Sequence, residues 1–231
     1  MNGQINGYSE VHQMVVKRQF TGDIIYNELK QKIIELEYAP GTAFSEEMLT
    51  GKLGISRTPL RQALLRLELE GLIVRQSNGR LQVAPVSAED AAEICQVREV
   101  LEGMIAREAT QIINPQQIVW LEDTLELMMR AAQDRRIYDT IRYGSEFHRR
   151  LYELCKNQTA IQFLAQVNNR LERYRRLGGY ENPGYDPMRS AEEHQAIFQA
   201  IVRKDPESAE QLMRAHIRRG MRIAVENLQL N

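Results

Sequence analysis

The sequence predicts a mainly α-helical protein in which a three-helix unit with a β-hairpin precedes an all-α bundle of about six helices. Apolar residues recur at the three- and four-residue spacing of amphipathic helices along most of the chain. The exception is a pair of short β-prone runs around the Asn-Gly step at 78–79, which is typical of a tight hairpin. Pro85 then interrupts the pattern, so we expect an arm at 1–19, a first domain at 20–86 and a second at 87–231.

Length and composition are those of an ordinary globular protein. The chain has 231 residues, of which 43% are apolar and 26% are charged. No apolar run reaches the roughly 18–20 residues that span a bilayer, and residues 1–18 lack the apolar core of a signal peptide. Cys95 and Cys155 form neither a disulfide framework nor a close-spaced metal motif. We therefore expect a cytoplasmic protein with no membrane partner.

Charge is unevenly distributed along the chain. The net charge is −1, but residues 52–80 carry six basic and two acidic side chains. Such a basic stretch can bind phosphates, although runs of charge are more often simply solvated faces. The stretch becomes informative only together with the helices that carry it.

The first domain opens with two helices and clear breaks between them. Helical periodicity begins near Asp23 and continues to Leu36, before Pro40-Gly41 ends the helix. Ser45 is a good N-cap for a short second helix, and Gly54 fits the left-handed position that ends it. The gap to a third helix is then about three residues, which is typical of a helix-turn-helix.

The third helix carries the candidate residues for nucleic-acid binding. Thr58 can cap it, Pro59 fits its first position, and its buried face runs as far as Gly71. The second helix of a helix-turn-helix reads bases with its first turns, where arginine and glutamine can pair with guanine and adenine edges. The candidates are Ser56, Arg57, Thr58, Arg61 and Gln62. With the hairpin, the unit is a winged helix; the alternative is a small three-helix domain with no DNA role.

These residues resemble the GntR family of bacterial regulators. The resemblance rests on Pro40-Gly41, Ser45-Glu46, Leu53-Gly54-Ile55-Ser56-Arg57-Thr58-Pro59-Leu60-Arg61, Ala63-Leu64, Leu67 and Glu70-Gly71-Leu72-Ile73. It implies a homodimer on a short palindromic operator, DNA contacts by Arg57, Thr58 and Arg61, and a wing tip at Asn78 and Gly79. The sequence departs from the family pattern at Glu47, where some members carry a DNA-contacting arginine.

The second domain reads as a bundle of helices. Asn114-Pro115, Asn157-Gln158 and Lys204-Asp205-Pro206 mark boundaries, and no strand-like alternation persists. The expected helices are 88–112, 115–134, 137–156, 159–177, 190–203 and 206–228. The longest loop, 178–184, is a candidate lid.

Three histidines of this domain fall at matched depths. His194 lies 11 residues before the turn at Asp205 and His216 lies 11 residues after it. Both therefore stand about 16 Å from that turn on antiparallel neighbours. His148 lies near the middle of its own helix, so the three could converge on a divalent metal. The alternative for any one of them is an ordinary core or surface histidine.

The domain resembles the FCD ligand-sensing domain of the FadR-type branch of GntR regulators. The resemblance rests on Val97-Arg98, Leu101-Glu102, Phe147-His148, Leu151, Asn157, Glu193-His194, Ile197, Ala200-Ile201, Asp205, Ala209, Met213 and His216-Ile217. It implies zinc or nickel held by His148, His194 and His216, with a small carboxylate effector nearby. Six helices favour the VanR-like subgroup.

One expected ligand of that site is missing. The family places an aspartate one turn before the first histidine, where this chain has Gly144. A water, the effector or a distant carboxylate could complete the coordination shell, or the metal could bind weakly or not at all.

Two further side chains are candidates for binding the effector. Arg98 could present its guanidinium fork to a carboxylate, or it could pair with Glu102 at i+4. Asn169 lies 12 residues past the turn at Asn157, at nearly the depth of His148, and could add a hydrogen bond.

The function predicted from these patterns is a DNA-binding transcription regulator, a repressor, controlled by a small organic acid. One alternative is a three-histidine metal-dependent enzyme fused to a winged helix. The sequence offers no nucleophile elbow, HExxH motif or phosphate loop to support it. A second alternative is a helical adaptor that uses its winged helix for protein contacts.

Overall fold

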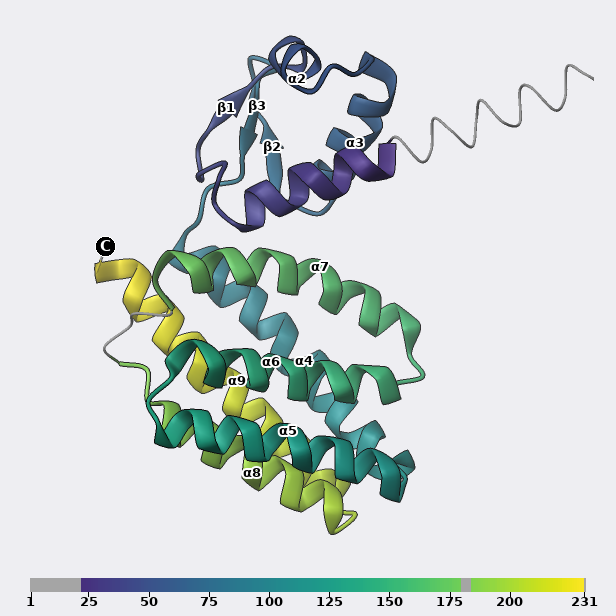
Figure 1. The fold of residues 1–231 in the computed structure, drawn as a ribbon, viewed down its shortest axis with the longest axis vertical. Coiled ribbons are helices and arrows are strands. Elements are labelled where there is room, and N and C mark those ends of the chain that lie inside the picture. Colours follow the sequence, from purple (N-terminus) through teal and green to yellow (C-terminus); the bar gives the residue numbers. More distant parts are fainter. Residues whose placement is uncertain (1–21, 180–183, 231) are drawn as a thin grey trace, which may run out of the picture. The chain divides into compact units, whose positions relative to one another are not determined.

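The computed structural model describes residues 22–179 and 184–230, which fall into two compact units, Met1–Val86 and Ser87–Asn231 (Figure 1). The expected arm at 1–19 lies outside the described residues, as do residues 180–183 of the candidate lid. The predicted fold class is confirmed, because a small sheet accompanies the helices of the first unit and the second unit is all helical.

The described part of the first unit, residues 22–86, contains three helices and three short strands. They are a helix at residues 22–34, β1 (Ala43–Phe44), α2 (Glu46–Leu53), α3 (Arg57–Leu69), β2 (Ile73–Arg75) and β3 (Leu81–Val83). The sheet is antiparallel in the order β1-β3-β2, so β3 lies at its centre. Strand β1 was not predicted, because two residues are too few to show an alternating pattern.

Local chemistry fixes the ends of these helices. Ser45 accepts a hydrogen bond from the Met48 amide at 3.1 Å, and Gly54 ends α2 in the left-handed region, with φ of 63°. Helix α3 begins two residues earlier than expected, at Arg57, with Ser56 rather than Thr58 at the N-cap. Asp23 is not the cap of the first helix but lies within it, where it pairs with Arg66 at 2.5 Å.

In the second unit, residues 87–179 and 184–230 form a bundle of six α-helices with one π-helical turn. They are α4 (Ala88–Ile112), α5 (Pro115–Gln133), α6 (Ile137–Leu154), α7 (Gln158–Tyr174), η1 (Arg175–Gly179), α8 (Pro187–Val202) and α9 (Pro206–Leu230). Helix α8 starts three residues earlier than expected, because the Asp186 side chain caps it and Pro187 occupies its first turn. The turn η1 replaces the expected end of α7 with a wider helix.

The bundle is held by one apolar core between its helices. Helices α4 and α9 pack along each other, and α5 contacts both α6 and α8 (Figure 1). The core includes Ile105, Leu121, Met128, Phe147, Leu151, Ile197 and Met213, all of them buried. No helix in the described part of the chain is both long and apolar enough to cross a membrane.

Candidate functional site

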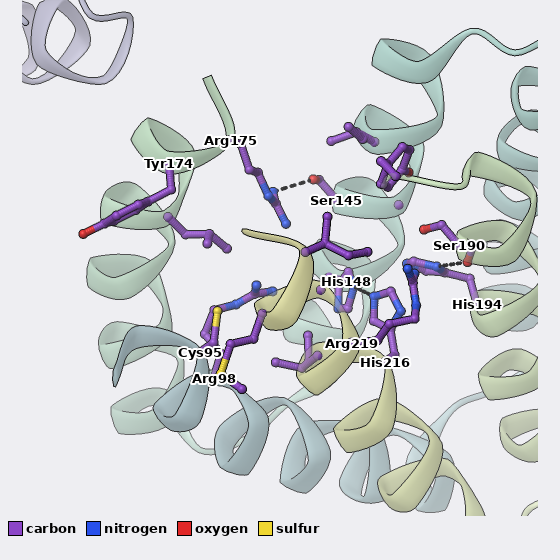
Figure 2. A pocket seen from close by; sticks show the side chains of 18 of the residues that line it. Cys95, Arg98, Ser145, His148, Tyr174, Arg175, Ser190, His194, His216 and Arg219 are labelled. Atoms are coloured by element: carbon purple, nitrogen blue, oxygen red, sulfur yellow. Dashed lines mark hydrogen bonds between the residues drawn. The ribbon is translucent and has the colours of Figure 1, made fainter. Parts of the chain in front are cut away.

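A cavity of about 130 Å³ opens inside the second unit, and the three histidines line it (Figure 2). His148 comes from the middle of α6, His194 from α8 and His216 from α9. One ring nitrogen from each histidine lies within 4.8 Å of the other two, and the two Nε2 atoms of His148 and His216 are 3.4 Å apart. The structure therefore brings together the three histidines that the helix arithmetic placed at matched depth.

Each ring is oriented by a partner on its other nitrogen. His194 Nδ1 donates to the Ser190 carbonyl at 2.8 Å, and His216 Nδ1 lies 2.8 Å from Glu193 Oε2. His148 Nδ1 contacts Glu102 Oε2. With each Nδ1 turned to an acceptor, each Nε2 keeps its lone pair, which is the arrangement found around metal-binding histidines.

His194 Nε2 is buried and has no hydrogen-bond partner among the described residues. Burial lowers the pKa of His194 well below its usual value, and it lowers the pKa of His216 to about 4 although Glu193 opposes the shift. Both rings are therefore neutral near pH 7, so their lone pairs are available to a cation or to a hydrogen-bond donor.

Glu102 is a fully buried carboxylate that joins two cavity residues. Its Oε1 contacts Arg98 Nη2 and its Oε2 contacts His148 Nδ1. Burial by itself would raise the pKa of Glu102, but Arg98 and His148 outweigh it and hold the pKa well below the usual range. Arg98 pairs with Glu102, as one of the two sequence-based alternatives predicted, and it also lines the cavity, so its contact with an effector stays a prediction.

Gly144 leaves space beside the histidine cluster. A Cβ atom on this residue would lie 3.3 Å from His194 Nε2 and 3.2 Å from Met128 Cε. A side chain at 144 would therefore start next to the ring nitrogen that has no partner. The position thought to lack a ligand does adjoin the cluster, and Glu146 points elsewhere, toward Arg149 and Arg150.

Asn169 is not brought to the cavity. It lies two residues before Leu171, which does line the cavity. Two residues correspond to about 200° of rotation around an α-helix, so the side chains of the two residues point to opposite faces. The depth estimate gave the height of Asn169 along α7 but not its direction.

Sequence reasoning missed several groups of the site. Arg175 and Arg219 also line the cavity, and Glu193 orients His216 while contacting Arg219. Glu193 adjoins a predicted ligand in sequence, yet only packing of α8 against α9 shows that it serves His216 rather than His194. Arg175 was missed although it lies four residues after Leu171, a spacing that puts both side chains on one face of a helix.

A second candidate site is the exposed N-terminal end of α3. The predicted DNA-contacting residues Ser56, Arg57, Thr58, Arg61, Gln62, Asn78 and Gly79 are all exposed. Arg61 Nε lies 2.7 Å from Glu46 Oε2 on α2, whereas Arg57 has no acidic partner within residues 22–179 and 184–230. At the wing tip, the Asn78 side chain accepts a hydrogen bond from the Arg80 amide at 2.9 Å, and Gly79 adopts φ of 79°.

Two family profiles match the two units. The profile described as "Bacterial regulatory proteins, gntR family" matches residues 21–83, and the profile described as "FCD domain" matches residues 93–219. The matches cover the winged helix and the helices that carry the histidine cluster.

Known proteins match this chain along most of its length and along most of their own. An "Uncharacterized HTH-type transcriptional regulator in unstable DNA locus" of Streptomyces ambofaciens is 30% identical over 84% of this chain and 80% of the relative. The "HTH-type transcriptional repressor RspR" of Escherichia coli is 26% identical over 84% of each chain. Among solved structures, "E. coli McbR/YncC" matches with a TM-score of 0.70 and 22% identity, covering 91% of this chain and 99% of that one.

Proposed function

The chain belongs to the gntR family of bacterial regulatory proteins and carries an FCD domain, and on this premise we propose that it is a repressor whose affinity for a palindromic operator is controlled by a small organic acid. That it is a DNA-binding transcription regulator follows from the family. The operator contacts, the dimer, the metal and the acid are the proposal. A regulator that acts on bacterial DNA is expected in the cytoplasm.

The proposed DNA contacts are made by Arg57, Arg61 and Gln62 to bases, by Ser56 and Thr58 to phosphates, and by Asn78 and Gly79 at the wing. Their exposure at the start of α3 supports this assignment. One chain carries one such helix, whereas a palindrome requires two of them about 34 Å apart. A symmetric homodimer is therefore the proposed DNA-binding form.

The proposed metal ligands are His148, His194 and His216, for a divalent ion such as zinc or nickel. The observation that carries the proposal is the buried Nε2 atom of His194, which faces the other two rings and has no partner among the described residues. A bound ion would supply a positive charge for an acidic effector. Family membership gives no support to the alternative of a three-histidine enzyme.

Elemental analysis of protein purified without an affinity tag or chelator tests the metal site. We expect about one divalent ion per chain in the parent protein, because three protein ligands suffice for a zinc site whose fourth position is left open to water or a ligand. His194→Ala should lose the ion. Glu192→Ala, an exposed neighbour on α8, serves as the control and should keep it. An ion retained in full by His194→Ala would contradict the assignment.

Gly144→Asp should raise metal affinity. The new carboxylate would begin beside His194 Nε2 and could act as the fourth ligand once the flexible Met128 side chain moves aside. We expect at least a tenfold tighter dissociation constant, roughly the smallest effect seen when groups that orient ligands are changed. Metal titration against a competing chelator would measure it. Gly144→Asn has the same shape without the charge, so equal affinities of the two variants would count against a coordinating role.

A further inference from the structure

Among the described residues, the side chains that line the cavity include positively charged groups and no negatively charged ones. Three arginines line it, namely Arg98, Arg175 and Arg219. Among the residues that the structure describes, no aspartate or glutamate lines it. Arg98 contacts Glu102 and Arg219 contacts Glu193, so two of the three arginines have close acidic partners behind the cavity wall.

Arg175 is the exception. Its Nη1 atom donates to the neutral Ser145 hydroxyl at 3.1 Å, and the nearest carboxylate, that of Glu172, is 3.8 Å away at the limit of an ion pair. The Arg175 side chain is 30% exposed, so its charge is neither fully solvated nor fully paired. Figure 2 shows it reaching from the end of α7 toward Ser145 at the cavity.

Helical periodicity explains why Arg175 faces the cavity. Arg175 directly follows the last residue of α7, and Leu171 and Tyr174, which lie up to one turn before it, also line the cavity. Residues three and four apart share one face of an α-helix, so Arg175 lies on the same face as these two side chains. The next residue, Arg176, does not line the cavity and pairs with Glu172 at 3.3 Å.

Ser145 connects Arg175 to the helix that carries His148. Ser145 and His148 are three residues apart on α6, so their side chains lie on one face about 5–6 Å apart. Arg175 is hydrogen-bonded to the first of these side chains, and the second belongs to the histidine cluster. The hydrogen-bond partner of Arg175 is therefore about one helical turn from the cluster along α6, and Gly144 leaves space beside the cluster.

We propose that the effector is a small dianion, a dicarboxylate of about four or five carbons, with one carboxylate at the histidine cluster and the other on Arg175. The proposal rests on the proposed function, since it specifies the ligand of the same cavity. A four-carbon chain separates its two carboxylates by about one helical turn. The apolar side chains of Met128, Ile141 and Ile217 line the cavity and suit the carbon chain between them.

Isothermal titration of the intact, metal-loaded protein with two matched acids tests the proposal. L-malate and L-2-hydroxybutyrate have the same number of carbons and the same hydroxy acid end, and they differ in the second carboxylate. We expect the parent protein to bind L-malate about tenfold more tightly, because a hydrogen bond between two charged groups is among the strong ones. In Arg175→Gln the ratio should fall to about one while the affinity for L-2-hydroxybutyrate is unchanged. Arg176→Gln, the matched control, should keep the parent ratio.

The other outcomes separate this proposal from the one on which it rests. Equal binding of the two acids by the parent protein, or no binding of L-malate, overturns the dianion. If Arg175→Gln still binds L-malate about tenfold more tightly than L-2-hydroxybutyrate, the proposed role of Arg175 is wrong. Metal content and selection of operator sequences from random DNA duplexes are measured on the same samples. If metal content and operator selection are normal but the parent protein does not prefer L-malate, the proposed function as a DNA-binding regulator is kept and only the proposed ligand is rejected.

Discussion

Glu102→Gln is expected to lower the free energy of unfolding of the helical unit by about 3–5 kcal/mol. The Glu102 side chain is fully buried, and the Arg98 side chain is only 7% exposed. Removal of the carboxylate charge leaves the guanidinium without a counterion in a low-dielectric interior, which costs more than the pair itself contributes. Gln keeps the shape of the side chain, so the decrease in the free energy of unfolding comes from the lost charge and not from changed packing.

Urea unfolding followed by tryptophan fluorescence measures this effect. Trp120 is the single tryptophan of the chain and lies on α5, so its signal follows the helical unit. Glu126→Gln on the same helix is the control, because Glu126 is 63% exposed and pairs with Arg130 at the surface. Such pairs are worth about 0–1 kcal/mol. A loss no larger for Glu102→Gln than for Glu126→Gln would show that the buried pair does not support the cavity wall.

The second large effect is expected at the DNA-binding surface. Arg57→Ala and Arg61→Ala should each weaken operator binding by about 1–3 kcal/mol if the two side chains pair with base edges. Operator binding by the parent protein should also weaken steeply as the salt concentration rises, because lysine and arginine contacts to DNA release counterions. Fluorescence anisotropy on a duplex obtained by selection from random sequences measures both. Lys32→Ala, outside the proposed contact set on the first helix, should bind like the parent.

The ion pair between Arg61 and Glu46 provides an internal check. If Arg61 serves only to hold α2 against α3, Glu46→Gln should reduce operator affinity as much as Arg61→Ala does. If Arg61 reads DNA, Glu46→Gln frees it from its acidic partner, and affinity should stay equal or rise. Unchanged affinity after substitution of both Arg57 and Arg61 would remove the basis for this DNA-contacting surface.

Much of the fold could be predicted because the helices begin and end at capping residues that can be recognised in the sequence. Asn114 and Gln117 form the capping box that opens α5, and Gly54 ends α2 in the conformation expected of it. The features that were missed depend on the rest of the fold. Strand β1 exists because β3 supplies its partner, and η1 has no local sequence rule that distinguishes it from a continuing α-helix.

The sequence predicted how far along its helix each site residue lies, but not toward which side of the helix its side chain points. Counting residues from the turn at Asp205 placed His194 and His216 at one level, and their rings are indeed 4.4 Å apart between centroids. The same arithmetic failed for Asn169, because depth along a helix says nothing about rotation around it. The contact of Glu193 with His216 was missed for a related reason, because the two residues lie on different helices.

The packing of α9 along α4 also sets the order in which the molecule can be completed during translation. The two helices lie at opposite ends of the helical unit in sequence, so the part of α4 that α9 covers stays exposed until α9 has left the ribosome. His216 arrives with that last helix. The winged helix has its whole sequence available much earlier. A nascent chain can therefore form its DNA-binding domain before the cavity of the helical unit is complete.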